Sequence, residues 1–254
     1  MPTSLTTAQL RHAAEKLPRV PLAHLPTPLE EIKRFAQKLD GPRVLIKRDD
    51  CTGMVMGGNK TRHNEFLFGE ALKQNADCLV WGAGVQSNNC RQTAATCNKL
   101  GLDCYLFLSR AVHNDDIQGN LLLDHLLGAK VTIIDTPMGP ELDDMLLAKA
   151  KELREAGRRP FVWNRITGRP IAAVSYALTL AEILDQARAR GIEPTHVYCA
   201  AAARPAAVWR SARRSSAGRA RFACCAQSAG RGTPQKIWRR SPTKPRHCSD
   251  CRIV

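Results

Sequence analysis

The stretch Gly57-Gly58-Asn59-Lys60 contains the first candidate for chemistry in this chain, an amine that follows two glycines. Glycine has no Cβ atom, so the backbone there can pass close to a flat ligand or turn without steric cost. A predicted helix begins directly behind the lysine. A lysine at such a junction can be partly desolvated, which lowers its pKa and suits its amine to Schiff-base chemistry. A surface lysine in a glycine-rich turn would have the same four letters, so this motif alone does not decide.

A second polar turn, Gln86-Ser87-Asn88-Asn89, follows a predicted strand and a glycine-rich turn and stands at the start of another predicted helix. Free N–H groups and the positive end of the helix dipole favour an anion there, such as a substrate carboxylate. Ser87 or Asn88 could equally serve only as the helix N-cap. Arg91 and Gln92, one turn into that helix, could be plain helix-surface residues.

The net charge of +15 comes mostly from the last part of the chain. Residues 199–254 contain 13 of the 38 Lys and Arg residues but a single acidic residue, Asp250. In residues 1–198, 25 basic residues face 22 acidic ones, as in an ordinary soluble protein. A basic tail could bind DNA or RNA. Because the body has no such excess, we predict that nucleic acid is not a partner.

Hydrophobic patterning argues against a membrane location. The chain has no run of about 18 apolar residues, the length that a membrane-spanning helix needs. Its N-terminus lacks the charged and then apolar pattern of a signal peptide, so we predict a cytoplasmic protein without a membrane partner. In that reducing compartment we do not expect disulfides.

The segment 199–254 has the composition of a segment that does not fold well. It is biased toward Ala, Arg, Ser and Cys and shows no clear apolar period. A shift of one nucleotide, with G or C chosen at third codon positions, would turn residues 233–252 into a well-patterned amphipathic helix. We therefore expect an aberrant basic tail, disordered or frameshifted. His247, Cys248 and Cys251 imitate a metal-ligand spacing, but one CxxC is a weak signal and we predict no metal site.

Helical and strand patterns alternate along the rest of the chain. Leu29, Ile32, Phe35 and Leu39 follow a capping-box pattern at residues 27–30 and predict a helix that ends at Gly41. Cys90 and Cys97 lie one heptad apart and should face the core. The alternation predicts an α/β protein with parallel sheets and helices on both faces. The other predicted helices are 6–17, 60–74, 89–100, 119–127, 142–156 and 171–190, and the strands are 44–46, 78–81, 104–108, 130–134, 161–163 and 195–198.

The motifs together are more specific than any one of them. The residues Lys47-Arg48-Asp49-Asp50, then GGNK, then the QSN turn, in this order and spacing, resemble the fold-type II pyridoxal-phosphate enzymes of the tryptophan-synthase-β superfamily. Within it, the likeness is to the branch of D-cysteine desulfhydrase and 1-aminocyclopropane-1-carboxylate (ACC) deaminase. The resemblance covers roughly residues 20–198. The runs that carry it include LPTPLEEIKRFAQKL, MGGNKTRHNEFL, GAGVQSNNCRQTAATCNKLGL and GNLLLDHLLGAKV.

That resemblance implies a role for each matching residue. Lys60 would hold pyridoxal 5'-phosphate covalently and move a proton at the substrate α carbon. Asn88 would hydrogen-bond the phenolic oxygen of the cofactor, and Ser87 would contact the substrate carboxylate and is a further catalytic candidate. The resemblance also places Asn59 among the cofactor-binding residues and Gln86, Asn88 and Asn89 among the substrate-binding ones.

The resemblance implies two open, mostly parallel sheets flanked by helices. Residues 1–52 and 166–198 would belong to a large domain, and residues 53–165 to a small domain that carries the QSN turn. After the strand at 195–198 such enzymes have a Gly/Ser/Thr-rich loop for the cofactor phosphate, but this chain has CAAAARPAAVW there. Cβ atoms and a proline hinder phosphate binding by backbone N–H groups. We therefore expect the C-terminal part of the large domain to be missing.

We predict a PLP-dependent lyase or deaminase that acts on a small amino acid, first of all D-cysteine. ACC deaminase is the alternative within the same class, and the QSN turn does not separate the two. An alternative of another class is a non-catalytic truncated fragment. A homodimer is what the resemblance suggests.

Overall fold

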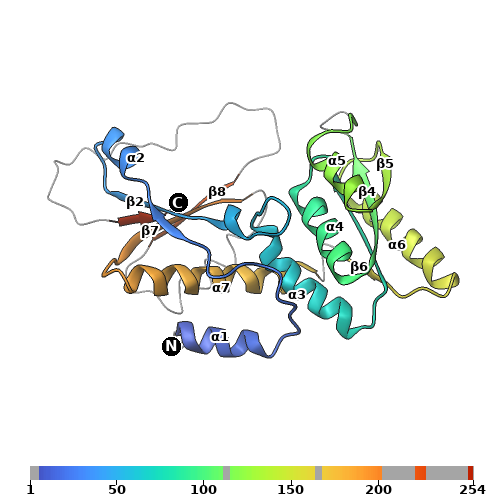
Figure 1. The fold of residues 1–254 in the computed structure, drawn as a ribbon, viewed down its shortest axis with the longest axis horizontal. Helices are drawn as coiled ribbons and strands as arrows, with labels where there is room; N and C mark the ends of the chain where they lie inside the picture. Colours follow the sequence, from blue (N-terminus) through green and yellow to red (C-terminus); the bar gives the residue numbers. More distant parts are fainter. Residues whose placement is uncertain (1–5, 111–114, 164–167, 202–220, 227–250, 254) are drawn as a thin grey trace. The chain divides into compact units, whose positions relative to one another are not determined.

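The computed structural model describes residues 6–110, 115–163, 168–201, 221–226 and 251–253. The chain divides into two compact units (Figure 1). Unit 1 consists of residues 1–10, 28–48 and 177–254, and unit 2 of residues 11–27 and 49–176.

Unit 2 is built on a four-stranded sheet in which every pairing is parallel. The strand order is β5-β4-β3-β6. Its strands are β3 (Cys78–Gly84), β4 (Asp103–Ser109), β5 (Lys130–Ile134) and β6 (Pro160–Val162). Its helices are α3 (Lys60–Lys73), α4 (Asn88–Leu100), α5 (Gly119–Leu126) and α6 (Pro140–Glu155).

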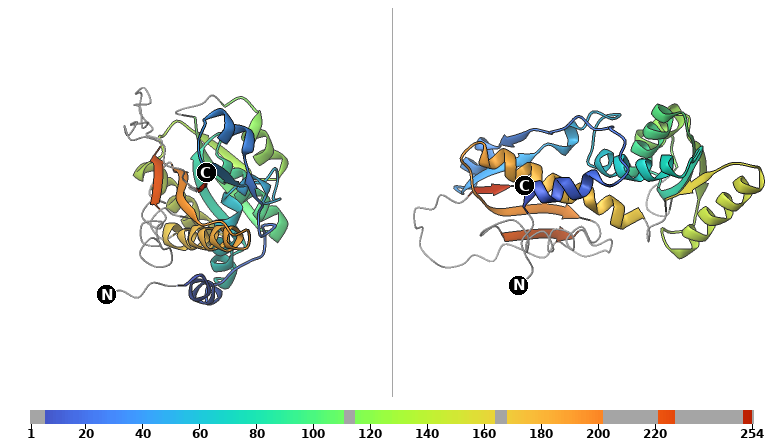
Figure 2. Two further views of the ribbon diagram at one scale, coloured as in Figure 1. Left: turned by 90° about the vertical axis from the view of Figure 1, so that its left-hand side faces the viewer. Right: turned by 90° about the horizontal axis from the view of Figure 1, so that it is seen from below.

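The strand order explains why helices cover both faces of this sheet. The chain steps outward from β3 to β4 to β5 and then returns through α6 to β6, on the other side of β3. Crossovers between parallel strands are right-handed, so a reversal of direction moves the connecting helix to the opposite face. Accordingly α3, α4 and α5 lie on one face, and α6 packs on the other against β3 and β6 (Figures 1 and 2).

Helix α3 has many polar side chains of its own and is nevertheless buried. Every residue from Thr61 to Gly69 is buried, including Arg62 and Glu65, which are 3% and 2% exposed. Burial of a charge is costly unless the group is paired and hydrogen-bonded. Glu65 meets this requirement because it accepts hydrogen bonds from Arg19 and from the backbone N–H groups of Leu22 and Ala23. The helix that begins at Lys60 is therefore fixed from several sides.

Unit 1 contains a five-stranded sheet of order β1-β2-β9-β7-β8, in which only the β1–β2 pair is antiparallel. Strands β8 and β9 come from the segment 199–254, and residues 202–220 and 227–250 lie outside the described part. The strands are β1 (Leu29–Glu31), β2 (Arg43–Lys47), β7 (Pro194–Ala201), β8 (Arg221–Ala226) and β9 (Cys251–Ile253). The remaining elements of the chain are α1 (Thr7–Glu15), α2 (Lys33–Lys38), the 3-10 turn η1 (Asp49–Cys51) and α7 (Gly168–Arg188).

The predicted α/β class with two mostly parallel sheets is confirmed. The predicted helix from Leu29 is wrong in its first turn, because Leu29–Glu31 forms a strand that pairs with β2, and the helix begins at Lys33. Thr27 does not cap it; its hydroxyl instead donates to Asp49 at 2.8 Å and accepts from Arg62 at 2.9 Å. Burial of the fully covered Leu29 therefore outweighs the local capping pattern.

The glycine-rich run before the QSN turn is strand and not turn, since β3 continues through Gly84. A Cβ atom on Gly82 would lie 2.8 Å from the carbonyl oxygen of Phe107 and 2.9 Å from Leu142. Glycine here allows close packing of β3 between its neighbours. Among the described residues, no helix is long and apolar enough to cross a membrane.

Candidate active site

The loop before Lys60 needs both of its glycines. Gly57 and Gly58 have φ values of +67° and +124°, which side-chain-bearing residues rarely adopt. A Cβ atom on Gly57 would lie 1.6 Å from the carbonyl oxygen of Asp50, and one on Gly58 would lie 2.2 Å from Nε2 of Gln92. The glycines therefore let the loop fold against its own start and against α4.

Two side chains of α4 hold this loop. The guanidinium of Arg91 and the amide of Gln92 each donate to the carbonyl oxygen of Gly57 at 3.0 Å. The amide oxygen of Gln92 also accepts from the Thr61 hydroxyl at 2.8 Å. Arg91 and Gln92 are 7% and 0% exposed, so they are not plain helix-surface residues, the alternative that the sequence allowed. They join the GGNK motif to the helix that the QSN turn begins.

A buried ion pair fixes the other side of α3. Arg62 donates to both carboxylate oxygens of Asp49, at 2.9 and 2.8 Å. Thr27 completes the group through its bonds to both residues. Asp49 belongs to the charged run 47–50, whose first residue lies in unit 1. There Lys47 is 6% exposed and donates to Glu182 at 2.5 Å and to Gln186 at 2.6 Å, so it is not part of a solvated cluster.

Lys60 is the first residue of α3 and is half-buried. Its Nζ lies 3.5 Å from the hydroxyl of Tyr176, and Nδ2 of Asn59 donates to the same hydroxyl at 2.8 Å. His63, one turn along α3, contacts Tyr176 and Trp163 edge to face. Burial, with a smaller contribution from the charge of Lys60, lowers the pKa of His63 to about 3. His63 is therefore neutral, and it contacts the rings of Tyr176 and Trp163 as an uncharged imidazole.

Ser87 is the N-cap of α4, as one of the two sequence hypotheses proposed. Its Oγ accepts hydrogen bonds from the backbone N–H groups of Asn89 and Cys90, both at 3.2 Å. These bonds occupy the lone pairs of the oxygen, and its hydrogen can still be donated. Ser87 can thus cap the helix and offer a hydrogen bond to a carboxylate at the same time.

Asn120, which begins the run GNLLLDHLLGAKV after Gly119 but was not predicted as a site residue, organises the rest of this turn. Its amide nitrogen donates to the Gln86 carbonyl oxygen at 2.8 Å and to Oδ1 of Asn88 at 3.0 Å. Because Oδ1 of Asn88 is engaged as an acceptor, the NH₂ group of the exposed Asn88 is left as a donor. The side chain of Gln86 is used structurally, since it donates to Gln118 and accepts from the backbone of Asn120.

The QSN turn lies at the point where the strand order reverses. It follows the carboxyl end of β3, whose neighbours β4 and β6 are reached in opposite directions along the chain. Ligands of open α/β sheets bind outside the carboxyl ends of strands at such a point. Trp163, directly after β6, stacks on Trp81 of β3 with ring centroids 4.3 Å apart and also contacts His63 of α3. The helix that carries Lys60 and the strand that leads to Ser87 thus share one aromatic cluster.

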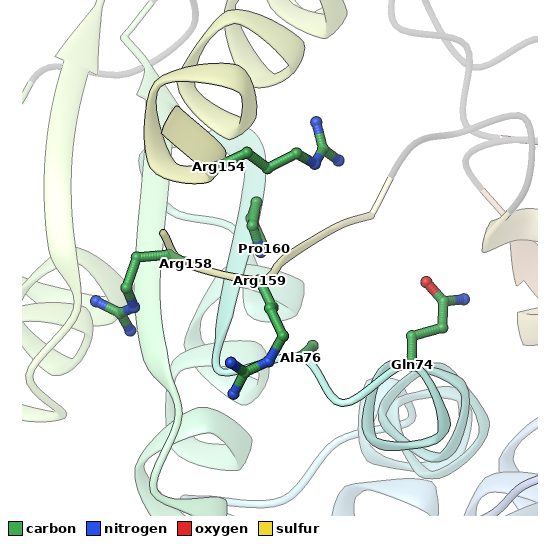
Figure 3. Close-up of a pocket in the computed structure, with 6 residues that line it drawn as sticks. All are labelled: Gln74, Ala76, Arg154, Arg158, Arg159 and Pro160. Atoms are coloured by element: carbon green, nitrogen blue, oxygen red, sulfur yellow. The ribbon is translucent and has the colours of Figure 1, made fainter. Parts of the chain in front are cut away.

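A cleft of about 330 Å³ lies at the opposite edge of this sheet, near the amino ends of β3 and β6 (Figure 3). Three arginines line it, but Figure 3 shows that their guanidinium groups diverge. Arg158 pairs with Asp77 and Asp103, and Arg159 pairs with Asp77. Arg154 lies in the last turn of α6, where a cation complements the helix dipole. These arginines stabilise strand and helix ends, and the cleft is remote from the motifs.

Free thiols occur at Cys51, Cys78, Cys90, Cys97, Cys104 and Cys199. Cys90 and Cys97 are buried in the core, as predicted. In the part of the chain that the structure describes, no three His, Cys, Asp or Glu side chains are placed to hold a metal. His247 and Cys248 lie outside that part, so the spacing noted there has no structural description.

Comparison with known proteins identifies the family. Residues 20–241 match the model of the family described as pyridoxal-phosphate dependent enzyme. The chain belongs to this family. The match includes the whole of unit 2 from residue 20 onward and continues into the segment 199–254.

Two names occur among the relatives that this chain matches. The chain is 36% identical over 195 residues to the D-cysteine desulfhydrase of Serratia proteamaculans, covering 75% of this chain and 58% of that protein. It is 35% identical over 175 residues to a putative ACC deaminase of Pyrococcus horikoshii, covering 69% and 53%. A crystal structure of an ACC deaminase homologue matches with a TM-score of 0.69 at 32% identity, covering 76% and 57%. The chain thus spans a little more than half the length of the relatives it matches.

The side chains of unit 2 fit one part of the cofactor that the family implies. A half-buried amine is the nucleophile that the cofactor aldehyde requires, and an amide NH₂ oriented by Asn120 is a donor for its phenolic oxygen. A hydroxyl at a helix N-terminus is a donor for a substrate carboxylate. The loop before this amine has no room for a Cβ atom at Gly57 or Gly58. The residues expected to meet the phosphate begin after β7, and 202–220 lie outside the described part.

Proposed function

We propose that this chain is a PLP-dependent lyase or deaminase of small amino acids, with D-cysteine as the first substrate and ACC as the second. The observation that carries the proposal is the pair of hydrogen bonds from Arg91 and Gln92 to the Gly57 carbonyl oxygen. These bonds connect the loop of Lys60 to the helix of Ser87 and Asn88. The names of the relatives support the choice of substrates.

When bound, pyridoxal phosphate supplies an electron sink for charge that develops at the substrate α carbon. The amine of Lys60 binds the cofactor and moves the proton at that carbon. The NH₂ group of Asn88 donates to the phenolic oxygen. The hydrogen of Ser87 and the positive end of α4 hold the substrate carboxylate. Asn59, Gln86 and Asn89 complete the proposed site residues, with Gln86 acting through its bonds to the start of α5.

The small domain expected at residues 53–165 corresponds in this proposal to most of unit 2. A homodimer and a cytoplasmic location are part of the same proposal, and sedimentation of the purified chain tests the first. That residues 199–254 are an aberrant tail is also a proposal, which re-sequencing of codons 195–205 tests directly.

Product analysis tests the activity. The purified chain with added pyridoxal phosphate should release sulfide and pyruvate from D-cysteine, or 2-oxobutanoate from ACC. Lys60→Ala should abolish the product, whereas Lys73→Ala, at the exposed far end of the same helix, should leave it unchanged. Absence of product from both substrates, or equal product from the Lys60 variant, would contradict the proposed activity.

A further inference from the structure

The hydroxyl of Tyr176 occupies a position that neither the sequence motifs nor the proposed activity assigns. Tyr176 lies on α7, 116 residues after Lys60, and its oxygen is 3.5 Å from Nζ of Lys60. The neighbouring Asn59 donates to the same oxygen at 2.8 Å. Two consecutive residues of the GGNK motif therefore meet one phenol group.

The hydrogen-bonding capacity of a phenol suits this position. A tyrosine hydroxyl has one hydrogen to donate and two lone pairs that accept. Asn59 donates to this oxygen, and Nζ of Lys60 lies within hydrogen-bond distance of the same oxygen. The ammonium form of Lys60 can donate to a hydroxyl oxygen, and the neutral amine can accept a hydroxyl hydrogen. The same hydroxyl can thus hold Lys60 in either protonation state.

The ring of Tyr176 is also held in place. It packs against His63 with centroids 5.7 Å apart at an interplanar angle of 71°. His63 is 5% exposed, and neither ring nitrogen has a hydrogen-bond partner in the described part of the chain. His63 therefore packs against Tyr176 as a neutral ring and makes no hydrogen bond to its hydroxyl. The charged groups near this end of α3 include Arg91, whose guanidinium is bound to Gly57, and the ion pair of Arg62 with Asp49.

We propose that Tyr176 is a positioning residue for Lys60: its hydroxyl, oriented by Asn59, is the docking partner of the Lys60 amine whenever that amine is not covalently engaged. This role rests on the proposed function, because a lysine that binds a cofactor and moves a proton must be held in both protonation states. The contact itself concerns side chains of unit 2 alone and can be tested without cofactor.

The test is acetylation of Lys60 by trace acetic anhydride between pH 6 and pH 11, quantified by peptide mass spectrometry on the chain without cofactor. A bond from the ammonium to the hydroxyl is charge-assisted and stronger than the bond to the neutral amine. Tyr176→Phe should therefore lower the pH midpoint of Lys60 acetylation by about one unit. Below the midpoint, Lys60 should react roughly tenfold faster, the effect of one hydrogen bond to a charged group.

Tyr105→Phe is the matched control. The Tyr105 hydroxyl on β4 also accepts from a lysine, Lys130, at 3.1 Å, but that pair is exposed and lies on the edge of the sheet away from the motifs. This variant should leave the Lys60 profile unchanged. A Tyr176→Phe profile that coincides with that of the unmodified chain would overturn the proposal, even if Lys60 binds pyridoxal phosphate.

If Tyr176→Phe does not fold, 4-fluorophenylalanine at position 176 keeps the ring and places a fluorine where the hydroxyl was, which has no hydrogen to donate and is a far weaker acceptor. The Lys60 midpoint should then fall as well, and a midpoint that stays in place would count against the proposal. Because no step of either experiment uses the cofactor, failure of the proposed enzymatic activity would not be mistaken for failure of this contact.

Discussion

The side-chain amide of Gln92 donates to the carbonyl oxygen of Gly57 over 3.0 Å, and this bond joins two motifs that lie 35 residues apart. The amide oxygen of Gln92 accepts from Thr61 at the same time, so one side chain holds both ends of the sequence that contains Lys60. Residue 92 therefore sets the position of the lysine relative to α4.

Gln92→Leu keeps the size of the side chain and removes both bonds. Buried groups that lose a partner cost about 1–3 kcal/mol, so the free energy of unfolding should fall by about that amount. Urea denaturation measures it. Gln74→Leu, at an exposed glutamine bound only to Glu70, should change the free energy by less than about 0.5 kcal/mol. Equal effects of the two substitutions would mean that the Gly57 contact is not important.

Gly57→Ala tests the close approach of the loop to its own start. The new Cβ atom would overlap the Asp50 carbonyl oxygen, and an alanine backbone would also be strained at this positive φ. We expect a loss of at least about 3 kcal/mol in unfolding free energy, or an unfolded protein. The control is Gly157→Ala, since Gly157 has a φ of +76° but no atom within 4 Å of its Cβ position. It should cost only about 1–2 kcal/mol.

Arg62→Lys tests the buried ion pair with Asp49. Lysine cannot reproduce the two parallel bonds of the guanidinium, so the carboxylate of Asp49 would lose this paired contact, while its Oδ1 would keep the bond from Thr27. Unfolding free energy should fall by roughly 3 kcal/mol. Arg43→Lys, in an exposed two-bond pair with Glu31, should cost under about 1 kcal/mol. A comparable loss at both sites would argue that burial of Arg62 does not matter.

Asp124 on α5 should give the protein a pH-dependent stability. It is fully buried, and neither carboxylate oxygen has a hydrogen-bond partner among the described residues. Burial raises its pKa from 3.8 to about 7, against a smaller opposing effect of Arg91. The folded state then holds this proton more tightly than the unfolded state. Stability from this group is complete below pH 4 and is lost as the pH rises to about 7, by up to about 4 kcal/mol.

Asp124→Asn should remove that loss, because the amide does not ionise. Urea midpoints of the variant and of the unmodified chain, measured from pH 4 to pH 8, should diverge as the pH rises, with the variant the more stable at pH 8. Asp144→Asn, at an exposed position on α6, should follow the unmodified chain at every pH. Parallel curves for Asp124→Asn would show that its carboxyl does not keep its proton.

Most of the helices and strands could be predicted because the signals for them, such as apolar spacing and helix-ending glycines, lie within a short stretch of sequence. The strand at 130–134 has the predicted bounds, and Gly101 ends α4 with a φ of +70°. The helix predicted from residue 6 has the Thr6 hydroxyl at its start, where it accepts from the backbone N–H of Gln9 as an N-cap does. The prediction of a helix at Leu29 was wrong because this segment pairs in a sheet with a strand 14 or more residues away. The local helix-start pattern contains no information on that pairing.

The contacts around the site were less accessible from the sequence because they are long-range. Arg91 and Gln92 have the spacing of surface residues, and only the fold shows that they turn toward Gly57. The roles of Asn120 and Tyr176 were not indicated by any motif, and the two residues reach the site from separate helices. The motifs thus indicated the reactive groups, while the groups that orient them required the three-dimensional structure.

Reductive trapping tests the central claim, that Lys60 is the amine which binds pyridoxal phosphate. The purified chain is incubated with pyridoxal phosphate, reduced with borohydride and digested, and the modified peptides are quantified by mass spectrometry. The proposed site predicts that the label is concentrated on the peptide containing Lys60 and disappears from it in Lys60→Ala. A label spread evenly over exposed lysines such as Lys73 and Lys130, with none enriched at Lys60, would contradict it.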